Sequence, residues 1–158
     1  MATLTGSRSA NTGLPAHSAG LVMLQGIVDM AVVEATAGIT IGSTDTFQVI
    51  GVPKGFVAFL GGWEVITAET GATTAQVEMG DGVDPNRYVA SATVAATGNA
   101  VPLALAANIP YMYTADDTVD LLASVAAPTN AKIRMWVVGF NPNDIGSTAD
   151  TADNNTWS

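Results

Sequence analysis

Residues 80–89, GDGVDPNRYV, hold the most chemically suggestive residue types of the chain within ten positions. Two glycines, two aspartates and an arginine could form a cation loop or a phosphate cradle. A phosphate-binding loop of the Walker type needs a lysine and then serine or threonine after its second glycine, and no lysine follows here. An EF-hand counted from Asp81 needs an acid at its third position and a glutamate at its twelfth, where this chain has Val83 and Ala92. The stretch therefore matches neither of these sites.

The same stretch fits the chemistry of a turn between two strands. Asp84 followed by Pro85 is typical of the first two positions of a type I turn. Gly80 and Gly82 are predicted to supply a positive φ or a bulge where the preceding strand ends. Arg87 is predicted to form an exposed ion pair with one of the two aspartates, which contributes about 0–1 kcal/mol. A weak cation site formed by these aspartates and backbone carbonyls is the alternative.

Carboxylates also cluster in residues 113–121, YTADDTVDL, at Asp116, Asp117 and Asp120. A glycosidase needs two carboxyl groups about 5–10 Å apart, one of them with a raised pKa. We favour the simpler interpretation, a turn in which an aspartate caps the backbone before the next strand. His17 is the only histidine, and it lies in a polar N-terminal stretch that offers no scaffold to orient it. We therefore expect no catalytic residue, no metal site and no cofactor, and the protein is not expected to be an enzyme.

Turn residues recur every eight to twelve positions between residues 21 and 140, with β-rich runs between them. This spacing is typical of a sandwich or barrel of short strands. In the last run Ile133, Met135 and Val137 share one face, and in the run before it Asp120 lies opposite the apolar face. Helical periodicity is weak throughout, so we predict an all-β fold. The expected strand runs are residues 21–35, 46–52, 56–68, 74–80, 87–94, 111–114, 118–126 and 132–140.

Charge is scarce in this chain. Only 12% of the residues are charged, about half of the roughly 25% usual in soluble domains, while 48% are apolar and the mean hydropathy is +0.33. Such a surface would expose apolar patches, which mark protein contacts, so we expect a subunit of a larger assembly. The net charge of −9 and five scattered bases argue against direct binding to nucleic acid. Apolar runs are too short for a transmembrane helix, the N-terminus lacks signal-peptide features, and the chain has no cysteine.

The length of 158 residues predicts a single domain flanked by two polar segments. We expect an N-terminal arm at residues 1–20, a β-sandwich domain at residues 21–140 and a C-terminal polar tail at residues 141–158. The arms are either disordered or become ordered against neighbouring subunits. Trp157 favours the second possibility, because an aromatic residue so close to a polar terminus is unusual unless it docks. Trp157, together with the polar residues of the 80–89 turn, is therefore a candidate subunit-contact residue.

Three strings resemble, in order and spacing, a family of small structural proteins encoded beside the capsid genes of tailed bacteriophages. They are VPKG at 52–55, MGDGVDPNRYV at 79–89 and YTADDTVDL at 113–121, and the segments MATLTGSRSANTG and GLVMLQGIVDM are also similar to that family. The polar tail after residue 141 and the glycines at 61 and 62 depart from its pattern. The resemblance implies a jelly-roll β-sandwich that cements or decorates an icosahedral head, often as a trimer at three-fold positions. It carries over no catalytic residue.

These observations lead to a first hypothesis, a capsid cement or decoration protein. It would bind the shell of the major capsid protein and stabilise the head as a homotrimer, at the capsid surface of a virion assembled in the host cytoplasm. The alternative is a carbohydrate-binding or tail-associated virion module, which needs a shallow groove lined by aromatics such as Trp63 and Trp136. A hydrolase that uses Asp116 and Asp117 is the least favoured. None of these hypotheses requires contact with nucleic acid or a membrane.

Overall fold

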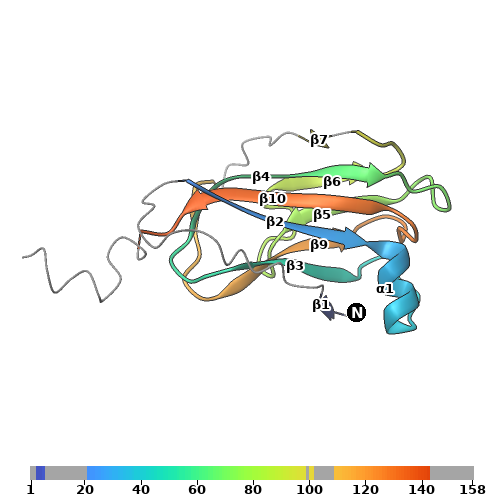
Figure 1. Cartoon of the computed structure of the whole chain (residues 1–158), viewed down its shortest axis with the longest axis horizontal. Coiled ribbons are helices and arrows are strands. Elements are labelled where there is room, and N and C mark those ends of the chain that lie inside the picture. Colours follow the sequence, from blue (N-terminus) through green and yellow to red (C-terminus); the bar gives the residue numbers. More distant parts are fainter. Residues whose placement is uncertain (1–2, 6–20, 99, 102–108, 143–158) are drawn as a thin grey trace, which may run out of the picture.

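The computed structural model describes residues 3–5, 21–98, 100–101 and 109–142, and it confirms the predicted all-β sandwich. Two sheets lie face to face (Figure 1). Sheet A has the order β1 (Thr3–Thr5), β3 (Thr46–Val52), β9 (Asp117–Ala123), β5 (Gln76–Gly80) and β6 (Val89–Thr93). Sheet B has the order β2 (Val22–Asp29), β10 (Lys132–Phe140), β4 (Val57–Thr67) and β7 (Ala100–Val101), and β8 (Tyr111–Met112) pairs with the other end of β4.

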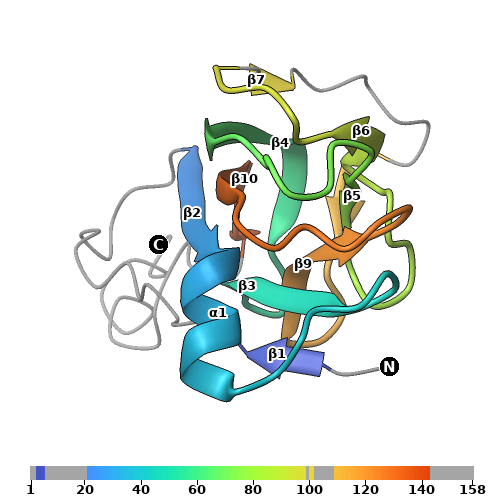
Figure 2. The same ribbon diagram turned by 90° about the vertical axis from the view of Figure 1, so that its right-hand side faces the viewer.

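The strand order is that of a jelly roll. Strands from the two ends of the domain are neighbours, since β2 pairs with β10 in sheet B and β3 pairs with β9 in sheet A. The orders β2-β10-β4-β7 and β3-β9-β5-β6 are those of two interleaved four-stranded sheets, and all their pairs are antiparallel. Among the described strands, β1 is the one that pairs in parallel, since it lies beside β3 at the edge of sheet A. The two layers are seen from the side of α1 in Figure 2.

The predicted strand at residues 21–35 ends at Asp29, where the helix α1 (Met30–Ala37) begins. Asp29 is the N-cap, and its side chain accepts a hydrogen bond from the amide N–H of Val32 at 3.3 Å. Gly38 ends the helix in the left-handed conformation, with φ of 62°, and its amide donates to the carbonyl of Glu34 at 2.9 Å. The sequence prediction missed these two caps. In the described part of the chain, no helix has the length and apolar character needed to cross a bilayer.

The core lies between the two sheets and follows the alternation expected for strands. Ile133, Met135 and Val137 of β10 are fully buried, as predicted. On β9, Leu121 faces the core and Asp120 lies on the opposite face, but Asp120 is also covered and only 6% exposed. Burial on both faces of β9 at this point was not expected from the sequence.

A buried carboxylate connects two loops at one end of the sandwich. Glu69, which is 1% exposed, follows β4 and accepts five backbone hydrogen bonds. The amides of Gly71 and Ala72 donate to Oε1, and the three amides of residues 129–131 donate to Oε2, at 2.7–3.2 Å. Burial by itself would raise the pKa of Glu69, but these hydrogen bonds lower it to about 2. The loop after β4 is thereby fixed to the loop before β10.

Candidate functional site

Residues 80–89 form a tight turn that is closed by the side chain and backbone of Asp81. Its Oδ1 accepts hydrogen bonds from the amides of Val83 and Asp84 at 3.0 and 2.8 Å. The amides of Asp81 and Arg87 donate in turn to the carbonyl oxygen of Asp84 at 3.0 and 3.2 Å. Asp81 is therefore the residue that organises the turn.

Gly80 is required by space and not by a positive φ. A Cβ at this position would lie 2.0 Å from the carbonyl oxygen of Asp84, because the turn folds back over the end of β5. The positive φ predicted for Gly80 and Gly82 is absent. The bulge predicted at these glycines is also not there; the register of β5 with β6 shifts earlier, between Val77 and Met79. The turn thus covers the outer surface of sheet A beside β9.

Arg87 pairs with Asp81 of the same chain, and the pair is buried instead of exposed. The Arg87 Nε donates to Asp81 Oδ2 and its Nη2 donates to Oδ1 at 3.3 Å, with the two residues 5% and 3% exposed. The guanidinium carbon also lies 3.6 Å from the centre of the Tyr111 ring. Burial would lower the pKa of Arg87, but the Asp81 carboxylate raises it above its ordinary value. Breaking one partner of such a pair costs about 3–5 kcal/mol, far more than the exposed pair predicted from the sequence.

Two tyrosines continue this cluster into the space between the sheets. The hydroxyl groups of Tyr88 and Tyr113 lie 2.7 Å apart and share a hydrogen bond. Burial raises the pKa of Tyr88 to about 12 and raises that of Tyr113 as well. The Tyr88 ring packs on Gly61 of β4, where a Cβ would lie 2.6 Å from the ring carbon Cδ1. Gly61, one of the two glycines that depart from the family pattern, therefore makes room for Tyr88.

This arrangement leaves little for a ligand to bind. Both oxygens of Asp81 accept hydrogen bonds, and its charge is compensated by Arg87. The cation site considered from the sequence would thus lack one of its two carboxylates. Over the residues that the structure describes, no three Asp, Glu or His side chains are grouped so that they could hold a metal ion. The 80–89 stretch is a structural corner of the sandwich.

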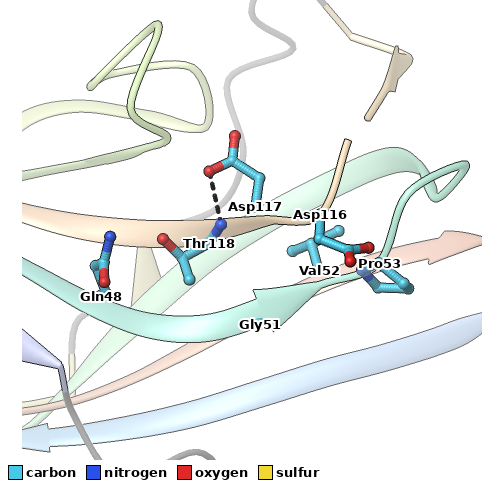
Figure 3. Close-up of a pocket in the computed structure, with 7 residues that line it drawn as sticks. All are labelled: Gln48, Gly51, Val52, Pro53, Asp116, Asp117 and Thr118. Carbon is cyan, nitrogen blue, oxygen red and sulfur yellow. Dashed lines mark hydrogen bonds between the residues drawn. The ribbon is translucent and has the colours of Figure 1, made fainter. Parts of the chain in front are cut away.

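The acidic turn before β9 borders an open pocket of about 500 Å³ (Figure 3). Asp116 Oδ1 accepts a hydrogen bond from the amide of Lys54 at 2.8 Å, and Asp117 Oδ1 accepts one from the amide of Thr118 at 2.8 Å. In Figure 3 the Asp116 carboxylate lies beside Pro53, whereas the Asp117 carboxylate points away from β3. Each aspartate caps the backbone, as predicted for a turn. The two do not converge on one point as a hydrolytic pair must.

Asp120 lies on β9 directly beside Gly80, where the 80–89 turn covers sheet A. Burial raises its pKa to about 6, and the carboxylates of Asp117 and Asp81 add to this effect while Thr118 opposes it. Its Oδ1 has no hydrogen-bond partner among the described residues. The stability of the sandwich is therefore expected to depend on pH near 6.

The outer surface of sheet B is apolar. We call this surface the apolar face and define it by Met23 and Ile27 of β2, Leu60 of β4, and Trp136 and Val138 of β10. The first three of these side chains are 44–52% exposed, and the two on β10 are half-buried. Met23, Val138 and Leu60 are neighbours across the three strands. This surface was not predicted, although the second face of residues 132–140 carries a signal for it, since Trp136 and Val138 alternate there with the core residues.

Trp63 and Trp136, the two tryptophans in the described part of the chain, do not form the aromatic groove that a carbohydrate-binding module needs. Trp63 is fully buried in the core, whereas Trp136 lies on the opposite surface of sheet B, on the apolar face. Trp157 and His17 lie outside the described residues, as does most of the predicted N-terminal arm and C-terminal tail.

No family model and no curated protein matches this chain. Solved structures of phage capsids do contain chains with this fold. A chain of the cyanophage Pam1 capsid asymmetric unit is 21% identical, with a TM-score of 0.61 over 85% of this chain and 95% of that chain. A chain of the Ralstonia phage GP4 capsid is 14% identical, with a TM-score of 0.64 over 89% and 98%. A chain of the acid-stable capsid of Helicobacter pylori bacteriophage KHP30 is 13% identical, with a TM-score of 0.51 over 77% and 88%. At such low identities the likeness shows the fold.

Proposed function

We propose that this chain is a non-enzymatic structural protein of a tailed-phage virion that binds the shell of the major capsid protein and stabilises the head. One observation carries the proposal. The three phage capsid chains are covered over 88–98% of their own length, so a subunit of this fold and size recurs in capsids. The order and spacing of the 79–89 and 113–121 strings favour the same class of protein.

The use of the polar residues supports a structural role. Asp81 and Arg87 close a turn, Glu69 joins two loops, and Asp116 and Asp117 cap backbone amides. These are the residue types from which a catalytic site would be built, and each one is engaged in holding the sandwich together. A cement protein acts through the contact area that it adds between shell subunits, and a rigid domain loses little conformational entropy when it binds.

The proposed function includes an oligomeric state. We infer a homotrimer at the capsid surface, because the family that the sequence resembles often occupies three-fold positions. The scarcity of charge is consistent with extensive burial against neighbouring subunits. Light scattering of the full chain is expected to give three times the 16.0 kDa of one chain.

Heads that lack this protein provide the direct test. The purified full chain is added to such heads of its own phage, and the mixture is sedimented. We expect saturable co-sedimentation and a higher temperature of DNA release from the decorated heads. A chain that stays in the supernatant at all concentrations would refute the proposal, and density on the tail in a particle reconstruction would favour the tail-associated alternative.

A further inference from the structure

We propose that the apolar face of sheet B is the surface through which copies of this chain associate with one another. The inference rests on the proposed function, which requires an oligomer, and it identifies the interface. β10 lies between β2 and β4 and presents a continuous outer surface with them (Figure 1). Solvent-exposed apolar residues gather there, and such patches mark protein interfaces.

The residue pairs across the three strands give the face a defined layout. Met23, Val138 and Leu60 form one row, and Trp136 lies in the next row between Gln25 of β2 and Gly62 of β4. Gly62 has no side chain that could cover the indole, and Trp136 is half-buried and partly exposed to solvent. Interface cores are enriched in aromatic residues and Met and depleted of charged residues, and these two rows contain Trp136 and Met23 and no charged residue. These two rows are the expected centre of the contact.

Charge explains why a second copy fits this face. The charged residues that follow these rows along β10 form ion pairs. Arg134 Nη1 lies 3.2 Å from Glu64 Oε2, and Lys132 Nζ lies 3.2 Å from Asp29 Oδ2. The face therefore carries no net charge, although the whole chain carries −9. Two identical acidic chains repel each other, and the repulsion is weakest where each presents a neutral surface. A basic partner would instead be expected to bind an acidic face.

The size of the face fits the core of such a contact. Eight residues at about 3.3 Å each and three strands at about 4.8 Å spacing give the whole outer surface of β2, β10 and β4, with its paired charges included, a footprint on the order of 400 Å². It is about half of the roughly 800 Å² that each partner buries in a standard interface. We therefore expect surrounding residues, such as the exposed Leu21 and Met112, to complete the contact.

The chain's own tail is the main competing occupant. The domain begins at Leu21 before β2 and its last described residue is Pro142 after β10, and these two strands pair through Val22 and Gly139. Both undescribed segments therefore join the domain beside the Met23 row. The sixteen residues after Pro142 are the competing segment, so the experiment must separate binding of this segment from association between copies.

Two variants that add the same charges test the proposal in the full chain. Met23→Glu with Leu60→Glu places two carboxylates on the apolar face, in the row that contains no basic residue. Val83→Glu with Val125→Glu is the matched control, because these valines are also exposed, at 80% and 55%, but lie in turns outside sheet B. Light scattering over a range of protein concentrations measures association, and circular dichroism confirms that both variants fold. We expect the association constant of the face variant to fall by at least about 100-fold, because a buried unpaired charge is costly, and that of the control to stay within about threefold.

Three results would overturn the proposal. The first is a wild-type chain that remains at the mass of one chain up to about 100 µM. The second is a face variant that keeps the wild-type mass. The third is a wild-type monomer that associates only after truncation at residue 142, which would assign the face to the tail.

Binding to heads separates this inference from the proposed function. A face variant that keeps its mass but no longer binds heads would show that the face contacts the shell, so the inference would fail while the function stands. If the face variant dissociates but no form of the chain binds heads, the inference stands and the function fails. A dissociated variant that still binds heads, more weakly than the wild type, is the result expected if both hold.

Discussion

Replacing Glu69 by glutamine tests whether one buried carboxylate holds together the loop after β4 and the loop before β10. Oε1 accepts two backbone amides and the Thr129 hydroxyl, and Oε2 accepts three backbone amides. A glutamine side chain has the same shape but would turn an NH₂ group toward at least two N–H donors. Those donors would lose their acceptor, and the charge that strengthens the remaining hydrogen bonds would be gone.

The magnitude follows from the pKa of Glu69. A pKa lowered from the ordinary 4.5 to about 2 corresponds to about 3 kcal/mol, at roughly 1.36 kcal/mol for each pH unit. Because the folded state holds the carboxylate more tightly deprotonated than the unfolded state, this contribution is complete above about pH 5. It is lost as the pH falls from there toward 2. Glu69→Gln is therefore expected to cost about 3 kcal/mol at pH 7 and much less near pH 2.

Urea unfolding followed by tryptophan fluorescence measures this difference, with the protein concentration held fixed because association also stabilises the folded state. Glu78→Gln is the matched control, since Glu78 lies half-buried on the outer face of sheet A. We expect the control to change the free energy of unfolding by less than about 0.5 kcal/mol. A Glu69→Gln variant within about 1 kcal/mol of the wild type at pH 7 would refute the reasoning. A difference that does not narrow in acid would refute it as well.

Three further changes test the rest of the structure. Gly61→Ala places a methyl group 2.6 Å from the Tyr88 ring and is expected to cost about 1–3 kcal/mol in urea unfolding; an unchanged midpoint would contradict the packing between the sheets. Arg87→Met leaves the Asp81 carboxylate buried without its cation, so we expect a loss of about 3–5 kcal/mol, and a loss under about 1 kcal/mol would argue against the buried pair. The pKa of Asp120 is about 6 in the folded protein and ordinarily 3.8, so wild-type stability should fall as the pH rises through this interval by up to about 3 kcal/mol. Asp120→Asn should remove that fall, and melting temperatures that keep the wild-type pH profile would contradict this assignment.

The strands could be predicted from the sequence because their signals are local. The runs at 46–52 and 132–140 coincide with β3 and β10, and the turn residues set the limits of most other runs within a few positions, whereas the run at 21–35 continues into the helix after Asp29. The alternation of Ile133, Met135 and Val137 also identified the core side of β10. The helix was missed although its caps are local, because Asp29 and Gly38 flank an apolar run that is equally compatible with a strand.

The environments of the polar residues could not be predicted, because they depend on partners far away in the chain. Glu69 accepts hydrogen bonds from residues 60–62 positions later. Arg87 is buried because Tyr111, from the other sheet, covers its guanidinium group. The sequence places Arg87 near Asp81 but contains no local indication of that ring. An ion pair expected at the surface therefore lies inside.

Several of the few charged residues of this chain are not available to hydrate its surface. Glu69, Asp81 and Arg87 are buried inside the domain, and Lys132 and Arg134 are each paired with an acid of the same sheet. Few charges remain to keep sheet B hydrated, and its central rows are apolar. A domain that only had to remain soluble as a monomer would gain from charges on that surface, since exposed apolar patches promote association. The interior of this sandwich is closed by its own loops, so the apolar face is not needed for folding of the core, and association between copies is the role that best accounts for it.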